Sequence, residues 1–339
     1  TRIGPASGGA DQATLTCNAS AVSLGSGLTS DFGLTVVKGG TFVGGTGTHT
    51  MGSVFIDAFA DAKCTLTSGV TTLDSEDSSG YTWRNNGGTF AHNDGTVTTN
   101  SSVDTKIREN TFYNLIINQS SSGKFVYWED TSGNTCTVAN DLTITTGRLR
   151  GLVASDTVTV TGDVLVDANG TFNHTSVWTG SINHGSLTIN SGGTYNATSG
   201  TTTITSRTGG TGTYALENNG TFTHNNGTVA ITDADNVVSL GLDSSLYNLE
   251  LSGGSKKIRN NTTINNNLTL TSGDLYGHSG SLTLDVKGQT ILNGGTTGQN
   301  IAFTGTMNWG SVTVNSGTLK LSSGTNNAES FRNVGGTIQ

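Results

Sequence analysis

The sequence predicts an all-β fold, an elongated β-solenoid or parallel β-helix built from two long internal repeats. Three observations predict it: sequence motifs that recur in the same order, short runs in which apolar and polar residues alternate, and glycine-rich turns with almost no proline. Tandem β-sandwich domains are the alternative architecture for the same strands.

The repeats are visible as sequence motifs that recur in the same order. The motif at residues 86–97 recurs at 219–229, and the motif at 112–117 recurs at 246–251. These matches divide the chain into four parts, which are an N-terminal β region with the tail of an earlier repeat (1–84), a first long repeat (85–213), a second (214–329) and the start of a further one (330–339). Because the register starts and stops within a repeat, we expect the array to be longer than 339 residues.

Short alternating runs supply the strands. Leu268-Thr269-Leu270 and Val312-Thr313-Val314 have the period of half-buried strands, so we expect almost no helix. Strands of this length favour solenoid turns over sandwich sheets, and 6% aromatic residues are few for two sandwich cores. The side chains expected to point inward are Leu142, Ile144, Leu268, Leu270, Val312 and Val314.

Glycine and proline usage agrees with tight turns between strands. The 49 glycines fit turns that need a positive φ, which glycine adopts without a Cβ penalty. Proline removes a ladder donor, and the chain has one, Pro5. Scarce proline and a net charge of only −8 also disfavour disorder, although hydrophobic residues make up just 32%.

Composition disfavours several classes of partner. Binding the phosphate backbone needs clustered cations, and this acidic chain has only 16 Lys and Arg, so we expect no nucleic acid. No apolar run approaches the roughly 18 residues of a spanning helix, so we expect no membrane insertion. Three cysteines are too few for a disulfide framework; a Cys17–Cys64 bridge and free buried thiols, with Cys136 unpaired in both cases, are the alternatives.

The recurring sequence motifs at 112–117 and 219–229 are similar to those of repetitive proteins of tailed-phage virions and of bacterial surface adhesins with parallel β-helix character, so the chain resembles these proteins. The resemblance covers most of residues 33–339. It implies a β-solenoid and an extracellular location, on a virion or a cell surface. It supplies no catalytic residues.

The first repeat is longer than the second near residues 123–135, and we interpret the extra residues as an insertion that forms a loop. Loops on a rigid scaffold often carry binding, and aromatic rings bind sugars. Covering an open side of the solenoid is the alternative role for these aromatics. The candidate binding residues are Phe125, Tyr127, Trp128, Glu129 and Asp130.

Metal and cofactor signals are weak. Asp233 and Asp235 could supply oxygens to a calcium ion, but the segment lacks the glycine and distal glutamate of an EF-hand loop. His92 and His224 occupy the same repeat position, which indicates packing or a turn hydrogen bond. We therefore expect no cofactor.

The sequence thus predicts a non-enzymatic structural or adhesive β-solenoid on the exterior of a phage virion, as a fibre, spike or capsid appendage, or on a bacterial surface. Its expected partners are copies of itself, neighbouring structural subunits and surface glycans. The alternative is a tailspike-like glycan hydrolase or lyase, which needs a pair of carboxylates. Candidate acids are Asp74, Glu76, Asp77, Glu129, Asp130, Asp233 and Asp235.

Overall fold

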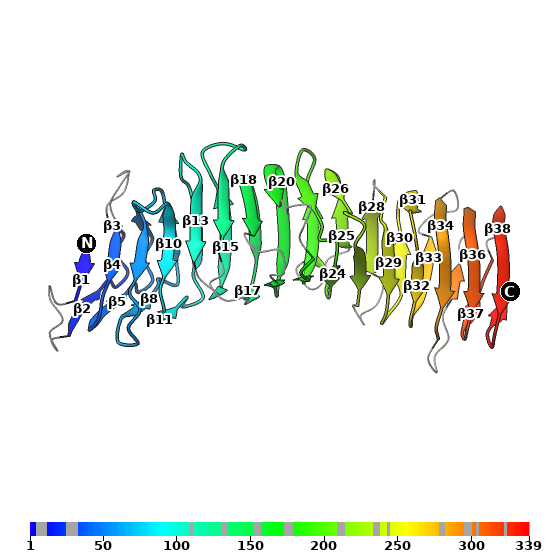
Figure 1. The fold of residues 1–339 in the computed structure, drawn as a ribbon, viewed down its shortest axis with the longest axis horizontal. Helices are drawn as coiled ribbons and strands as arrows, with labels where there is room; N and C mark the ends of the chain where they lie inside the picture. The colour runs from blue at the N-terminus through cyan, green and yellow to red at the C-terminus, as the bar shows by residue number, and fades with distance from the viewer. Residues whose placement is uncertain are drawn as a thin grey trace. The chain divides into compact units, whose positions relative to one another are not determined.

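The computed structural model shows a parallel β-solenoid (Figure 1). It describes residues 1–4, 12–24, 33–108, 111–129, 135–151, 157–172, 179–208, 214–232, 238–242, 245–277, 282–294, 300–302, 305–321 and 324–338. These residues contain no α-helix, and no helix among them is long and apolar enough to cross a membrane.

Each turn of the solenoid contributes strands that pair with the next turn. Leu34 pairs with Val54, Phe42 with Cys64 and Met51 with Leu73, all in parallel. Each of these pairs joins one strand of a turn to the strand about one turn further along the chain. A sandwich would need antiparallel hairpins, so the solenoid prediction is confirmed and the sandwich alternative is wrong.

The chain forms two compact units, residues 1–161 with 166–175, and 162–165 with 176–339. The repeat boundaries predicted above are a separate property, and this division does not test them. The strands of the first unit are β1 (Arg2–Ile3), β2 (Ala13–Thr16), β3 (Val22–Leu24), β4 (Leu34–Val36), β5 (Gly40–Val43), β6 (His49–Met51), β7 (Val54–Ile56), β8 (Lys63–Thr65), β9 (Val70–Leu73), β10 (Tyr81–Asn85), β11 (Thr89–Ala91), β12 (Thr96–Thr99), β13 (Thr105–Arg108), β14 (Thr111–Phe112), β15 (Asn114–Asn118), β16 (Phe125–Trp128), β17 (Thr135–Val138), β18 (Leu142–Gly151) and β19 (Thr157–Val160).

Strand β20 (Asp163–Phe172) belongs in part to each unit. The strands of the second unit are β21 (Ile182–His184), β22 (Ser186–Ile189), β23 (Thr194–Asn196), β24 (Thr201–Ile204), β25 (Tyr214–Asn218), β26 (Thr221–Thr223), β27 (Thr228–Ile231), β28 (Val238–Leu242), β29 (Asn248–Leu251), β30 (Lys256–Ile258), β31 (Thr262–Ile264), β32 (Leu268–Leu270), β33 (Asp274–Gly277), β34 (Thr283–Leu292), β35 (Asn300–Ala302), β36 (Thr306–Val314), β37 (Thr318–Leu319), β38 (Asn326–Asn333) and β39 (Thr337–Ile338).

The core of each turn is a small set of aliphatic side chains stacked on those of the next turn. Leu115 pairs with Leu142 in the first repeat, and Leu249 pairs with Leu268 at the matching place in the second. Full burial of a leucine stabilises by about 1.5–3 kcal/mol. All six side chains predicted to point inward are buried, which confirms that prediction.

Asparagine side chains link neighbouring turns in both repeats. The Nδ2 of Asn140 donates to Oδ1 of Asn114 at 2.8 Å, and Asn266 donates to Asn248 at 2.9 Å in the second repeat. The same local contacts recur because the same residues recur at each position.

The recurring histidines have the structural role that the sequence predicts. The Nδ1 of His92 accepts a hydrogen bond from the N–H of Asp94 at 3.1 Å, and its ring stacks on Tyr113 at 5.4 Å. His224 accepts the corresponding bond at 3.0 Å and packs against Tyr247 at 5.7 Å. A turn hydrogen bond with ring packing therefore explains both residues.

The three cysteines, Cys17, Cys64 and Cys136, are free and buried. Of the two alternatives drawn from the sequence, the free thiols are the ones observed. Parallel strand pairing, not a covalent bridge, joins the turns around them.

Candidate binding face on strands 7 to 18

The segment predicted as an inserted loop is a strand of the regular ladder. Strand β16 pairs with β13 on one side and with β18 on the other. The second repeat has its own strand, β30, at the corresponding place after β29. The loop prediction was wrong for residues 125–128, which form a strand that has a counterpart in the second repeat.

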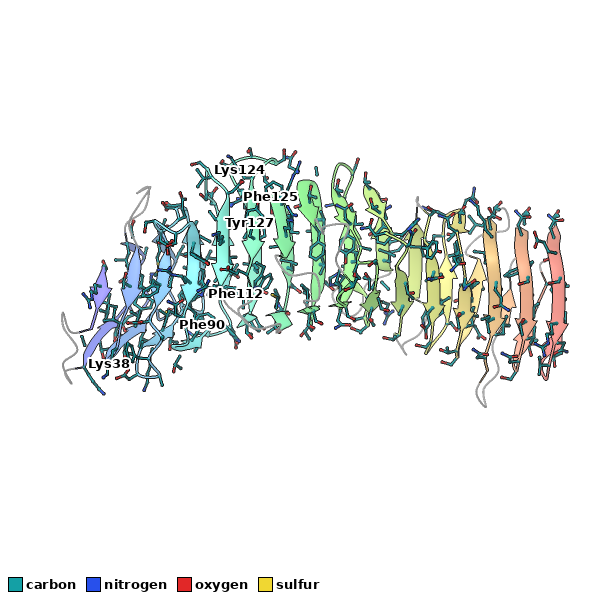
Figure 2. All side chains as sticks on the ribbon, in the orientation of Figure 1. Lys38, Phe90, Phe112, Lys124, Phe125 and Tyr127 are labelled. Carbon is teal, nitrogen blue, oxygen red and sulfur yellow. The ribbon has the colours of Figure 1, made fainter. Side chains whose placement is uncertain are left out.

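Alternation along β16 separates the predicted aromatic residues onto two faces. Trp128 points inward, is 2% exposed and packs edge to face on Phe112 at 6.1 Å. Phe125 and Tyr127 point outward and stack on each other at 5.4 Å (Figure 2). Of the three aromatic residues predicted from the sequence, only Phe125 and Tyr127 can take part in a contact surface. Asp130 lies outside the described residues.

Strand register aligns cations with these rings. Lys106 is paired with Tyr127, Tyr127 with Arg150 and Phe125 with Arg148. Side chains two residues apart share a face of a strand, so the outward residues of five paired strands form one surface. We call it the aromatic–cation face, and its members are Phe55, Tyr81, Arg84, Lys106, Arg108, Phe125, Tyr127, Arg148 and Arg150.

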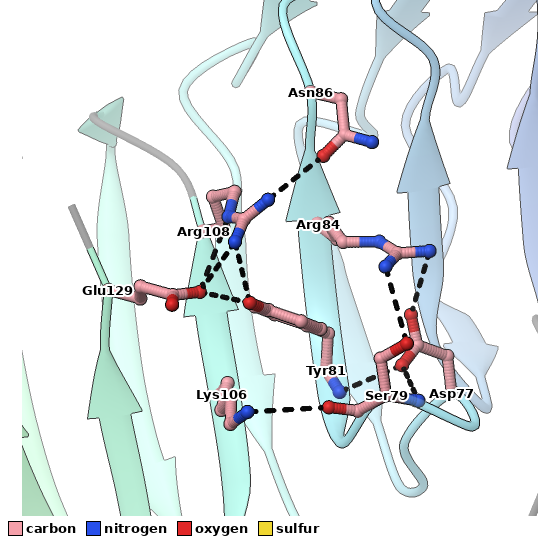
Figure 3. Close-up of polar contacts among 8 residues, drawn as sticks. All are labelled: Asp77, Ser79, Tyr81, Arg84, Asn86, Lys106, Arg108 and Glu129. Atoms are coloured by element: carbon pink, nitrogen blue, oxygen red, sulfur yellow. Dashed lines mark hydrogen bonds and ion pairs between the residues drawn. The ribbon is translucent and has the colours of Figure 1, made fainter. Parts of the chain in front are cut away.

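Three cations surround the Tyr81 ring (Figure 3). Arg108, Lys106 and Arg84 lie 4.9, 5.1 and 5.3 Å from its centroid, within the range of cation–π attraction. Burial, and then the hydrogen bond and charge of Glu129, raise the pKa of Tyr81 to about 12. The Tyr81 hydroxyl is therefore protonated at physiological pH, and the residue is only 6% exposed, so it supports the surrounding cations more than it offers a surface of its own.

The Glu129 carboxylate is held by this cluster. Its Oε2 accepts hydrogen bonds from Nη2 of Arg108 at 3.0 Å, from Nε of Arg108 at 3.3 Å and from the Tyr81 hydroxyl. Arg108 also donates from Nη1 to Asn86 at 3.3 Å. Glu129, a candidate binding residue, thus orients two other members of the face.

Asp77 stabilises the turn that leads to Tyr81. Its Oδ1 accepts from the N–H of Ser79 at 2.7 Å and of Tyr81 at 3.0 Å, and its Oδ2 is 3.4 Å from Arg84. The Asp77 side chain is only 1% exposed. It fixes the turn before β10 and presents little negative charge to solvent.

Other cations of the face have no carboxylate partner within the described part of the chain. Lys106, Arg148 and Arg150 form no ion pair there. Arg148 lies 5.1 Å from the centre of the Phe125 ring and donates to the Ser122 carbonyl at 3.2 Å. Their charges are available to an anionic ligand.

The second unit carries a smaller arrangement of the same kind. Arg259 lies 4.9 Å from the centroid of Tyr214 and donates to its hydroxyl at 2.8 Å, and Lys257 lies 5.3 Å from Tyr276. Tyr214 corresponds to Tyr81 in the repeat. Sequence reasoning missed Tyr81. Its recurrence at Tyr214 is a signal that could have pointed to it, but the pairing of tyrosine with cations from other turns is not visible in the sequence.

A cleft of about 640 Å³ lies beside β11 and β14. Strand β11 pairs with β8 and β14 pairs with β17, and in the described residues no pairing joins β11 to β14. The residues that line the cleft are Asn85, Gly88, Phe90, Ala91, His92, Asn93, Asp94 and Thr111.

The described residues contain no group of three His, Cys, Asp or Glu side chains close enough to hold a metal ion. The weak calcium candidates, Asp233 and Asp235, lie outside the described residues.

Comparisons with known proteins found no match for this chain: no family model, no curated protein and no solved structure matches it. The fold and the aromatic–cation face are therefore the features that indicate a function.

Replacing Glu129 by Gln should lower the pKa of Tyr81 from about 12, because the Glu129 charge and hydrogen bond both raise it. The pKa should stay above that of a free tyrosine, since burial is the larger cause. We expect a loss of about 1 kcal/mol in unfolding free energy. Tyrosinate absorbance measures the titration, with Tyr81→Phe identifying the signal. An unchanged titration would contradict the contact.

Proposed function

We propose that this chain is a non-enzymatic adhesive and structural β-solenoid on the outside of a phage virion or a bacterial cell. The observation that carries the proposal is the aromatic–cation face, a row of outward rings and cations on consecutive parallel strands. Its ligands would be surface glycans, and neighbouring copies or structural subunits would hold the shaft in place.

The ladder supports a mechanical role. Strands of successive turns are bonded through their backbones, as in the pairing of β12 with both β9 and β15. Asparagine side chains add bonds between turns. A chain whose backbone groups are paired in this way resists local opening and proteolysis, which suits exposure outside a cell.

The acids near the face support binding over catalysis. Glycan hydrolysis by carboxylates needs one acid and one base or nucleophile on either side of the bond. Asp77 is buried in its turn, and Glu129 is engaged by Arg108 and the Tyr81 hydroxyl. Such carboxylates position other side chains.

A binding and cleavage assay tests this function. The purified chain should be retained by polysaccharide from a bacterial surface, while incubation with the same material should release no new reducing ends. The same sample treated with a known glycan hydrolase is the positive control for cleavage. Release of reducing ends by this chain would refute the non-enzymatic proposal.

Location can be tested independently of binding. Antibody against the chain should label purified virions or intact cells without permeabilisation. Labelling found only after cells are broken open would contradict an exterior location, whatever the binding assay shows.

A further inference from the structure

We infer that the aromatic–cation face binds an acidic polysaccharide, a polymer whose sugar units carry carboxylate or sulfate groups. This inference rests on the proposed adhesive function and specifies its ligand class. It follows from the sign of the charge on the face, the exposure of its rings and the spacing of its rows.

The face is cationic on an acidic chain. The net charge of the whole chain is −8, yet Lys106, Arg148 and Arg150 gather on adjacent strands without an ion-pair partner in the described residues. Two further guanidinium groups, those of Arg84 and Arg108, lie beside them in register. Local positive potential on an acidic body selects and orients an anionic ligand.

The rings supply a surface for sugar. Phe125 and Tyr127 stack with an angle of 15° between their planes and are half-buried, so part of each ring meets solvent. Sugar rings present C–H groups that pack on aromatic faces, while their charged substituents need cations close by. Arg148 and Arg150 stand next to these two rings in register.

The spacing fits a polymer. Paired strands lie about 4.8 Å apart, close to the length of one sugar unit in an extended chain. Lys106, Tyr127 and Arg150 follow one another on β13, β16 and β18, so cation, ring and cation alternate along a single row. Because the backbone ladder fixes this row, binding orders few groups of the protein.

Nucleic acid is the competing polyanion. Its backbone carries one charge per ~3.4 Å of strand, and proteins that bind it use many clustered cations. This chain has 16 Lys and Arg against 24 Asp and Glu, so a ligand of lower charge density that also presents sugar to the rings fits better.

The experiment compares two triple variants of the full chain on immobilised polyuronate, sulfated polysaccharide and a neutral polysaccharide. Lys106→Gln/Arg148→Gln/Arg150→Gln removes three charges from the face. Lys63→Gln/Lys287→Gln/Lys320→Gln removes three exposed charges elsewhere and is the matched control. We expect binding of the acidic polymers to weaken at least tenfold in the first variant and less than twofold in the control.

Arg150→Gln alone is a second, milder variant whose circular dichroism and melting curve should match those of the parent, and it should bind at least threefold more weakly. Equal binding of neutral and acidic polymers would overturn this inference and leave the adhesive function standing. Retention on none of the polymers would overturn both. Binding of single-stranded DNA as tight as that of polyuronate would also overturn it, in favour of a charge-only surface.

Discussion

Truncation of Trp128 to Ala should reduce the free energy of unfolding by about 3–5 kcal/mol, the usual cost of removing a large aromatic ring from a core. Its ring is 2% exposed and packs against Phe112, which also packs against Trp83. The neighbouring Tyr127→Ala should cost about 1 kcal/mol or less, because that ring points outward. Urea unfolding followed by circular dichroism measures both.

The two variants should differ in the opposite sense in polysaccharide binding, where Tyr127→Ala is expected to lose more than Trp128→Ala. Tyr127→Ala should weaken retention on polysaccharide, while any Trp128→Ala protein that remains folded should bind like the parent. Equal losses of stability in the two variants would contradict the alternation assigned to β16 and would mean that both rings pack into the core.

Acidification should destabilise the second unit through His184. This histidine is buried on β21 and lies 2.7 Å through Nε2 from the Tyr195 hydroxyl, and burial lowers its pKa to about 3. An unfolded histidine has a pKa of about 6.5, so below that pH the unfolded state takes up a proton first. Stability is therefore complete above pH ~6.5 and is lost by about 1.4 kcal/mol per pH unit as the pH falls toward ~3.

A double variant isolates this effect from the titration of carboxylates. His184→Phe/Tyr195→Phe replaces the polar pair with apolar rings, as the second repeat does with Trp309 at the position of His184. Urea titrations between about pH 7 and 4 measure the unfolding free energy of both proteins. The parent's value should fall more steeply with falling pH than that of the double variant, and the two slopes should differ by about 1.4 kcal/mol per pH unit. Parallel pH profiles would show that His184 is protonated equally in both states.

Much of the fold was predictable from the sequence because its signals are local and repeat. The period-two runs gave the strands, and the inward residues, such as Leu142 and Leu268, are those that the alternation selects. The recurring His92 and His224 have matching turns because identical neighbours surround them. The loop prediction at residues 125–128 was wrong, since a longer connection in one repeat looks the same in the sequence whether or not it contains a strand.

The sequence by itself determined the all-β class, the repeats, the inward alternation and a structural role for His92 and His224, through packing or a turn hydrogen bond. Only the tertiary structure decided that Trp128 belongs to the core while Phe125 and Tyr127 face outward, since a shift of one residue in register exchanges the two faces of a strand. It also brought Tyr81 to Glu129, 48 residues away. The physical reason is that contacts between turns depend on how many residues each turn contains, and turn lengths vary along this chain.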